Sequence, residues 1–442
     1  MIDFTNGQST NRTRTAQLLT VLERDLATYI ALRHQLHALP ETSYEEHRTS
    51  ALVATELESY GLEVTRGVGR TGVVGVLRNG SSRRAIGLRA DMDALPIAEQ
   101  NDCSYRSTVP GKMHACGHDG HTTMLLWAAR HLSSTRDFDG TVIFIFQPAE
   151  EAGAGGREMV QDGLFERFPV DEVYGMHNIP SIPVGHFAVM PGPMMASGDF
   201  FKIELRAKGG HAALPHTTAD PILAGSALVQ SLQSIVSRTF DPLEPAVLSV
   251  TQFHGGEVIN AIPATVTLQG TARSYTPSAQ DTLDAGIHRI SAGIAASYGL
   301  EVKSRFRRGY PPTINSADEA EFARQVLERL VGSERVLTHL KPLMTAEDFS
   351  YMLQVRPGAY IWIGNGDSAG LHTGHYDFND AALPFGAAYW VCLAESALQK
   401  PVPSAAPDKS GKSTNLDYIA IQDSIGQSQD LSNFYKKRKV YL

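Results

Sequence analysis

The first 190 residues alternate between apolar positions at helical spacing and short, continuous apolar runs. Helical spacing occurs in three segments, at 15–38, 43–60 and 120–134. Apolar runs that predict strands lie between and after them, at 72–77, 85–92 and 141–151. Strands that alternate with helices predict an α/β layer around a largely parallel sheet.

From about residue 190 the order of predicted elements changes to β-α-β-β-α-β. The strands are expected at 200–208, 246–256, 264–274 and 300–309, with helices at 221–238 and about 278–298. This order is the signature of a ferredoxin-like α+β domain. The sequence therefore predicts a small domain over 191–308 that is inserted into a larger one.

The α/β pattern then resumes, with a helix at 319–332, a strand at 359–364 and a helix at 383–398. We therefore expect the larger domain to comprise residues 15–190 and 309–399. Residues 400–442 begin with a segment rich in Pro, Ser, Ala and Lys, which predicts a disordered tail.

Composition narrows the possible functions. The 442 residues exceed one ordinary core, and the formal net charge of -8 gives no strong attraction to nucleic acid or anionic lipid. No apolar run reaches the roughly 18 residues of a membrane span, and the first residues lack the apolar segment of a secretion signal. Three cysteines are too few for a disulfide framework, so a reducing cytoplasm is expected.

The segment HACGHDGH, residues 114–121, carries the strongest local chemistry. It places His114, Cys116, His118, Asp119 and His121 within eight positions, directly before a predicted helix. Thiolate, imidazole and carboxylate are the groups that divalent transition metals prefer as ligands. A polar loop with a buried thiol is the alternative, and metal binding is the favoured interpretation.

Four more polar clusters also follow predicted strands, where ligands of α/β sheets bind. They contribute Asp91 and Asp93, the adjacent Glu150 and Glu151, His177, and His372 with His375. Adjacent glutamates point in different directions, so one can bind a metal while the other acts as a general base. An aspartate after a strand can steady a ligand or simply cap a loop. Together with HACGHDGH, these clusters predict one shared site.

In the inserted domain, His211, Asn260 and Arg273 are the notable polar residues. Taken alone, they fit turn and surface positions better than a functional site.

The motifs together resemble the metal-dependent aminoacylase and carboxypeptidase family of peptidases. The resemblance is greatest to the amidohydrolase branch of hippurate hydrolase, N-acetyl-amino-acid deacetylases and the auxin-conjugate (IAA-amino acid) hydrolases. It covers residues 15–398. It is carried by RADMDALP, MHACGHDGH, QPAEE, GMHN, GGHAALPH, the N-x-IPA segment, AEDFS and LHTGHYDFND.

The resemblance implies a metal-binding α/β catalytic domain with an inserted ferredoxin-like lid that also forms a dimer contact. It implies two divalent metal ions, with manganese as the first choice and zinc, cobalt or nickel as alternatives. The implied ligands are Cys116, His118, Glu151, His177 and His372.

The resemblance also assigns roles around the metals. Glu150 would be the general base and acid, and Asp93 would steady a ligand. His211, Asn260 and Arg273 would bind the substrate carboxylate or the oxyanion, with His211 reaching the neighbouring subunit of a homodimer. Thr373 and Gly374 stand where relatives often have Ser and Pro, which puts the shape of the His372 loop in question.

The implied reaction is hydrolysis of the amide bond of a small N-acyl amino acid by a metal-activated water. A dipeptidase or carboxypeptidase on the same scaffold is the alternative. A metal-dependent binding protein without activity is disfavoured, because the chain retains Glu150 and every implied ligand. The residues that shape the acyl pocket, around Met194, Met195 and Phe253, do not reveal the acyl group.

Overall fold

A computed structural model describes residues 17–400 of the chain. Its largest feature is an eight-stranded sheet with the order β1-β2-β4-β3-β5-β16-β6-β15. The central strands β4 (Gly140–Gln147), β3 (Ala85–Asp91), β5 (Glu172–Pro180) and β16 (Gly358–Gly366) are parallel. The flanking strands β1 (Glu63–Val68), β2 (Gly72–Asn79) and β6 (Phe187–Ala188) join them by antiparallel pairing. The sheet is therefore mixed around a parallel centre.

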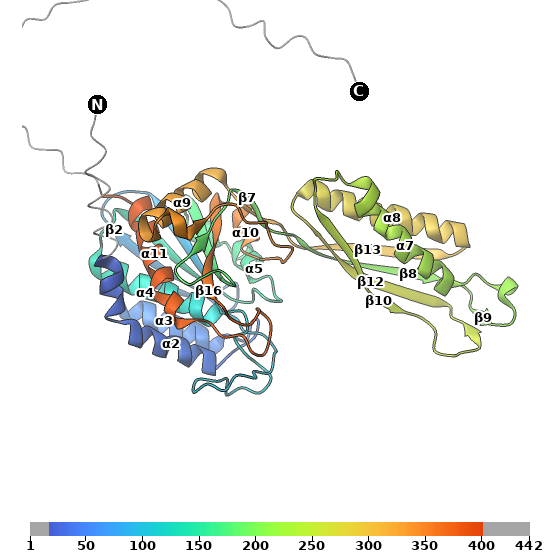
Figure 1. Ribbon diagram of the computed structural model, residues 1–442, viewed down its shortest axis with the longest axis horizontal. Coiled ribbons are helices and arrows are strands. Elements are labelled where there is room, and N and C mark those ends of the chain that lie inside the picture. The colour runs from blue at the N-terminus through green and yellow to red at the C-terminus, as the bar shows by residue number, and fades with distance from the viewer. Residues whose placement is uncertain (1–16, 401–442) are drawn as a thin grey trace, which may run out of the picture. The chain divides into compact units, whose positions relative to one another are not determined.

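Helices cover both faces of this sheet (Figure 1). On one face lie α2 (Leu26–Ala38), α3 (His47–Ser59), α4 (His118–Thr135), α9 (Ala317–Val331) and α11 (Leu383–Ala397). On the other face lie the shorter α5 (Gly155–Gln161), α6 (Leu164–Arg167) and α10 (Ser350–Leu353). Successive side chains of β16 point to opposite faces of the sheet. Ile361 packs against the helices of the first face and Tyr360 against those of the second.

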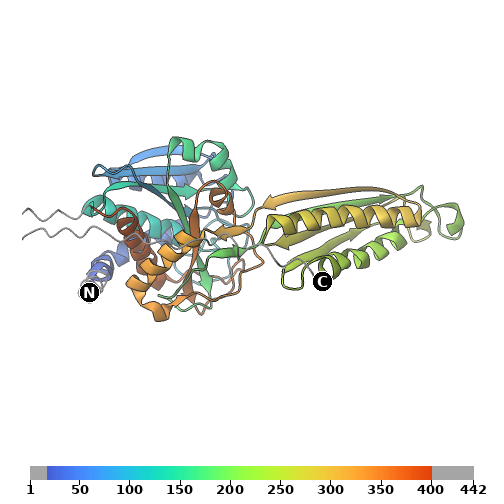
Figure 2. The same ribbon diagram turned by 90° about the horizontal axis from the view of Figure 1, so that it is seen from above.

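Residues 198–310 form a second sheet with two helices, and we call this whole α+β unit the small layer. Its strands are β8 (Gly198–Arg206), β10 (Ala246–His254), β12 (Thr265–Ser274) and β13 (Glu301–Tyr310), in the antiparallel order β10-β12-β8-β13. Helices α7 (Pro221–Thr239) and α8 (Pro277–Tyr298) lie side by side on one face (Figure 2). This is the arrangement expected of a ferredoxin-like unit. Its boundaries as a domain and its role as a lid remain predictions.

Short elements complete the described chain: β7 (Gly192–Met195), β9 (Gly210–His211), β11 (Ala261–Ile262), β14 (Thr313–Asn315) and β15 (Val336–Leu337), with single 3-10 turns at Pro215–Thr217, Ser333–Arg335 and Asp380–Ala382. No helix among residues 17–400 is both long and apolar enough to cross a bilayer. The tail expected at 400–442 lies almost entirely outside the described residues.

Two expected helices differ in detail, and one strand of the large sheet was not expected. The helix predicted over 15–38 is interrupted at 24–25, where backbone bonds tighten from i−4 to i−3 spacing. The helix predicted from residue 43 begins at His47, because the Glu41 carboxylate accepts the N–H groups of Arg48 and Thr49 at its first turn. The apolar pattern does not predict strand β1, because only one of its six residues is buried and they show little apolar periodicity.

A buried polar network anchors α2 against the start of α4. His37 is fully buried between Asp119, 2.9 Å from its Nδ1, and Glu99, 3.2 Å from its Nε2. Arg33, also fully buried, contacts Asp119 at 3.3 Å and Asp377 at 3.1 Å. Burial alone would lower the pKa of His37, but the hydrogen bonds to Asp119 and Glu99 outweigh it and raise the pKa to about 9.

The charged form of His37 should therefore stabilise the fold in a pH-dependent way. Since the pKa is raised from 6.5 to about 9 on folding, the contribution is complete below about pH 6.5 and disappears as the pH rises through about 9. We expect His37→Gln to lower the free energy of unfolding by about 2 kcal/mol at pH 6. The difference from the wild type should narrow by pH 10 in urea denaturation. An unchanged difference across this range would contradict the charged network.

Candidate metal centre and active site

The site lies at the carboxyl edge of the parallel strands, where their side chains and following loops converge. Asp91 ends β3, and His177 lies in the carboxyl-terminal half of β5. Glu150 and Glu151 follow β4, and His372 lies in the loop after β16. Segments far apart in the sequence therefore meet here because they leave the same edge of one sheet.

Gly117 allows Cys116 and His118 to face the same place at the start of α4. It adopts a left-handed conformation with φ of 90°, and a Cβ there would lie 2.3 Å from Nδ2 of Asn178. That amide donates to the carbonyl of Cys116 at 2.6 Å, and the hydroxyl of Tyr376 donates to its oxygen at 2.7 Å. The backbone at Cys116 is thus held by β5 and by the His372 loop.

All five residues implied as metal ligands come together. The Sγ of Cys116 lies 3.3 Å from Nε2 of His177 and 3.3 Å from Nε2 of His372. The same His372 nitrogen is 3.3 Å from Oε1 of Glu151, which lies 3.9 Å from Nε2 of His118. One continuous group of thiol, imidazole and carboxylate atoms results.

The hydrogen bonding of this group fits a metal site. The Nε2 of His118 and Oε1 of Glu151 are buried without a hydrogen-bond partner, an arrangement that is costly unless another species binds them. The Nδ1 of His177 lies 2.6 Å from the carbonyl oxygen of Asn178, so Nε2 is left for a cation. Nitrogen, sulfur and oxygen donors in this combination suit divalent transition metals.

The electrostatics of the group point the same way. Burial raises the pKa of the Cys116 thiol well above its ordinary value, and the charges of Glu151 and Glu150 raise it further. Burial alone would lower the pKa of His118, but Asp91 and Asp93 outweigh it and raise the pKa to about 10. A bound cation would favour the thiolate and the neutral imidazole, and so relieve both conditions.

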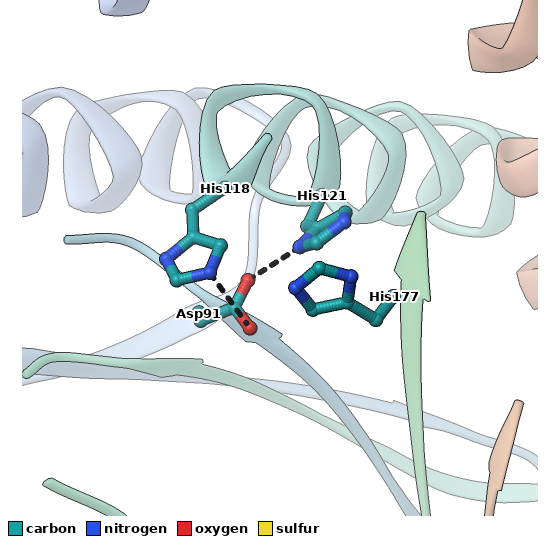
Figure 3. Close-up of side chains that lie close together, drawn as sticks. All are labelled: Asp91, His118, His121 and His177. Atoms are coloured by element: carbon teal, nitrogen blue, oxygen red, sulfur yellow. Dashed lines mark hydrogen bonds and ion pairs between the residues drawn. The ribbon is translucent and has the colours of Figure 1, made fainter. Parts of the chain in front are cut away.

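Asp91 and His121 form a supporting pair beside His118 and His177 (Figure 3). The Nδ1 of His121 lies 2.6 Å from Oδ1 of Asp91, and its Nε2 accepts the N–H of Asn178 at 2.9 Å. Both nitrogens of His121 are therefore occupied. Asp91 approaches Nε2 of His118 at 3.7 Å. The sequence assigns no role to His121, and it predicts that Asp91, like Asp93, could steady a ligand or cap a loop.

Asp93 connects His118 to the loop that carries the two glutamates. Its carboxylate accepts the backbone N–H of Glu150 at 3.0 Å and that of Glu151 at 3.1 Å. Ser43 donates to the same group at 2.9 Å, and Nδ1 of His118 lies 3.4 Å away. This position supports the implied role in steadying a ligand, and adds a second one in holding the glutamate loop.

Glu150 is buried among other carboxylates. Burial raises the pKa of its side chain well above the ordinary value, and the charges of Glu347 and Glu151 raise it further. The backbone N–H of Asp348 lies 3.4 Å from its Oε1. A raised pKa makes a carboxylate a stronger proton acceptor than an ordinary glutamate, as a general base requires.

Arg89 balances part of this negative charge. It is fully buried and contacts Asp91 at 2.8 Å, Glu347 at 2.9 Å and Asp348 at 3.2 Å. Its Nε donates to Gln147 at 2.9 Å. Sequence reasoning missed Arg89, Glu347 and Asp348 as site residues, although all three lie inside motifs that carried the resemblance, RADMDALP and AEDFS.

A cavity of about 290 Å³ opens onto the group. Glu150, Glu151, Cys116, His177 and His372 form its polar side. The apolar wall consists of Ile179, Met195, Leu343, Trp362 and Leu371. Of the three residues expected to shape the pocket, Met195 lines the cavity, Met194 is buried in the core, and Phe253 lies on β10 of the small layer.

The implied substrate-binding residues of the small layer are not joined to this group. His211 is exposed on β9, where Nδ1 accepts the N–H of Ala213. Asn260 accepts the N–H of Ala212 through its backbone carbonyl. Among residues 17–400, no hydrogen bond or ion pair connects His211 or Asn260 to the candidate ligands. The contact implied for His211 is with a second subunit, and it stays a prediction.

Arg273 lies nearer the cavity. Its Nη1 donates to the carbonyl of Ser197 at 3.4 Å and lies 2.7 Å from the point that a Cβ on Gly198 would occupy. The Cβ of Ala346, which lines the cavity, is 3.1 Å from the same point. The guanidinium is half-buried and forms no ion pair among the described residues. It therefore remains available to an anion.

Addition of a divalent metal should stabilise the folded chain, because the ions bind atoms that are brought together only by folding. At a hundred times the Kd, the gain is about 2.7 kcal/mol per site, measured as a rise in Tm after chelator treatment and refilling. His118→Gln should lose most of this rise. His131→Gln, in the same helix but outside the group, should keep it. Equal responses of the two variants would argue against His118 as a ligand.

Comparisons with known proteins place the chain in one family. The sequence profile of "Peptidase family M20/M25/M40" matches residues 87–396. Hippurate hydrolase of Campylobacter jejuni is 42% identical over 82% of this chain and 94% of its own. IAA-amino acid hydrolase ILR1-like 4 of Arabidopsis thaliana is 38% identical over 88% and 89%, and thermostable carboxypeptidase 1 of Saccharolobus solfataricus is 39% identical over 76% and 85%.

A solved structure extends the likeness to the fold. A dinuclear metal-binding peptidase of the M20 family from Bacillus subtilis superimposes with a TM-score of 0.76 and 32% identity, over 85% of this chain and 99% of that one. The fold, the motifs and the family profile agree, and the chain belongs to peptidase family M20/M25/M40.

Proposed function

We propose that this protein hydrolyses the amide bond of small N-acyl amino acids with the help of two divalent metal ions. The observation that carries the proposal is the position of Glu150, a buried carboxyl group with a raised pKa, on the same cavity wall as four of the five candidate ligands. The relatives named for hippurate and IAA-amino acid hydrolysis support the substrate class.

Cys116, His118, Glu151, His177 and His372 would hold the metals. Bound metal ions supply Lewis-acid polarisation of the amide carbonyl and a water whose pKa is lowered toward about 7. Asp93 keeps His118 and Glu151 in place through the contacts described above. Manganese is our first choice of metal, with zinc, cobalt or nickel as alternatives, because a mixed set of donors leaves metal availability to decide.

Glu150 would move the proton. Its carboxylate takes a proton from the attacking water and returns it to the nitrogen of the leaving amino acid. Burial and the neighbouring carboxylates raise the pKa of this group, which makes it a stronger proton acceptor than an ordinary glutamate.

The small layer would complete the substrate site. Arg273 is suited to the free carboxylate of the amino acid through a bidentate pair. Asn260 and His211 would bind the substrate or stabilise the oxyanion, His211 from the neighbouring subunit.

Apolar side chains of Leu214, Val258 and Ile259 are exposed close to them in sequence, which supports a homodimer through this layer. Sedimentation of the metal-loaded protein would test the dimer. The expected cytoplasmic location stays a prediction.

Replacement of the proposed base should separate metal binding from turnover. Glu150→Gln keeps the volume of the side chain but cannot accept the proton, so kcat should fall by about 10²–10⁴-fold. Metal content, measured by elemental analysis, should be unchanged. The control Glu158→Gln removes a surface carboxylate that pairs with Arg70, and its kcat should match the wild type. Full activity of Glu150→Gln would refute the assignment.

A substrate panel decides between the proposed activity and its alternative. Apo-protein refilled with each metal is assayed with hippurate, N-acetyl amino acids, indole-acyl conjugates and dipeptides. We expect acyl amino acids to have the higher kcat/KM, because the apolar wall of the cavity suits an uncharged acyl group better than a free ammonium. Higher kcat/KM for dipeptides would instead identify a dipeptidase or carboxypeptidase.

A further inference from the structure

The loop that carries Glu150 has a backbone that needs support from outside. Ala149 and Ala154, one on each side of the two glutamates, adopt left-handed conformations with φ of 52° and 54°. Alanine rarely adopts this conformation, because its Cβ crowds the backbone. Such a conformation persists only where surrounding contacts fix it. The direction of the Glu150 side chain therefore depends on the partners of this loop.

Two residues fix the backbone of Glu150 from opposite sides. Its N–H donates to Asp93 at 3.0 Å, and its carbonyl oxygen accepts the hydroxyl of Tyr310 at 2.5 Å. The same hydroxyl accepts the N–H of Ala154 at 3.2 Å, so Tyr310 spans the loop. Because both its N–H and its carbonyl are held, the backbone of Glu150 is fixed, and so is the direction in which its side chain leaves the backbone.

Tyr310 does not come from the large sheet. It is the last residue of β13 and pairs with Gly198 at the start of β8, at the root of the small layer. The adjacent Gly309 is held by Asp199, which accepts its N–H at 3.1 Å, and by Tyr351, which donates to its carbonyl at 2.9 Å. The tether to Glu150 is thus built into the connection between the two sheets.

We propose that Tyr310 is a positioning residue that aligns Glu150 for proton transfer and links that alignment to the small layer. The proposal rests on the proposed role of Glu150. Any displacement of β13 relative to the glutamate loop must either move the carbonyl of Glu150 or break the bond from Tyr310. Small misplacements of a reacting group cost large factors in rate, so this bond is a direct route by which substrate contacts in the small layer affect the base.

The test compares Tyr310→Phe with Tyr44→Phe. Tyr44 also donates to this loop, but to the carbonyl of Gly153 at 2.7 Å, and it comes from the segment between α2 and α3. For Tyr310→Phe of the metal-loaded protein we expect kcat for hippurate to fall about tenfold or more. KM, metal content and Tm should stay close to the wild type, because the ring still fills its site. Tyr44→Phe should change kcat by less than about threefold.

Hydrogen exchange of the 149–155 segment, followed by mass spectrometry, gives a readout that does not need turnover. Tyr310→Phe should exchange faster than the wild type there, since the N–H of Ala154 loses its acceptor. Unchanged exchange together with unchanged kcat would overturn the proposal. Equal losses of kcat in both variants, or parallel losses of metal and Tm, would show a general structural role instead. A wild type that cleaves none of the panel substrates would refute the proposed function, and exchange would still test the tether.

Discussion

The concentration of buried acidic groups at one edge of the large sheet is the constraint on which the site depends. Asp91, Glu150, Glu347 and Asp348 are all buried there, and the buried Arg89 contacts three of them. Burial of unpaired charge is unfavourable unless protons or cations compensate it. The raised pKa of Glu150 and the proposed metal binding by Glu151 would both reduce this excess of negative charge, so the two proposed roles have a common electrostatic origin.

Much of this arrangement is predictable from sequence because it depends on chain direction. Parallel strands release Glu151 and His177 at the same edge, and the motif HACGHDGH puts Cys116 and His118 at the start of a helix that faces that edge. Apolar runs long enough to be buried on both faces mark the central strands β3, β4 and β16. The resemblance to known motifs then supplies the roles that spacing alone leaves open.

What sequence could not supply are contacts between groups without local pattern. Arg89 looks like an ordinary polar residue in a strand, and only folding reveals the three carboxylates around it. Tyr310 ends a strand with no motif of its own, yet reaches the backbone of Glu150. The first residue of a helix is hard to predict for the same reason, since the side chain of Glu41 determines where α3 begins. Each is decided by a long-range or side-chain contact rather than by periodicity.

The dual contacts of Asp93 restrict how this protein could change over evolutionary time. One carboxylate holds the imidazole of His118 and the peptide groups of both glutamates. If these residues have the proposed roles, mutation of Asp93 would impair metal binding and catalysis together. Substitution of Glu150 could remove activity and leave metal binding intact, because its side chain is not among the proposed ligands. In a lineage that has lost activity but kept its metals, Asp93 should be retained and Glu150 replaced.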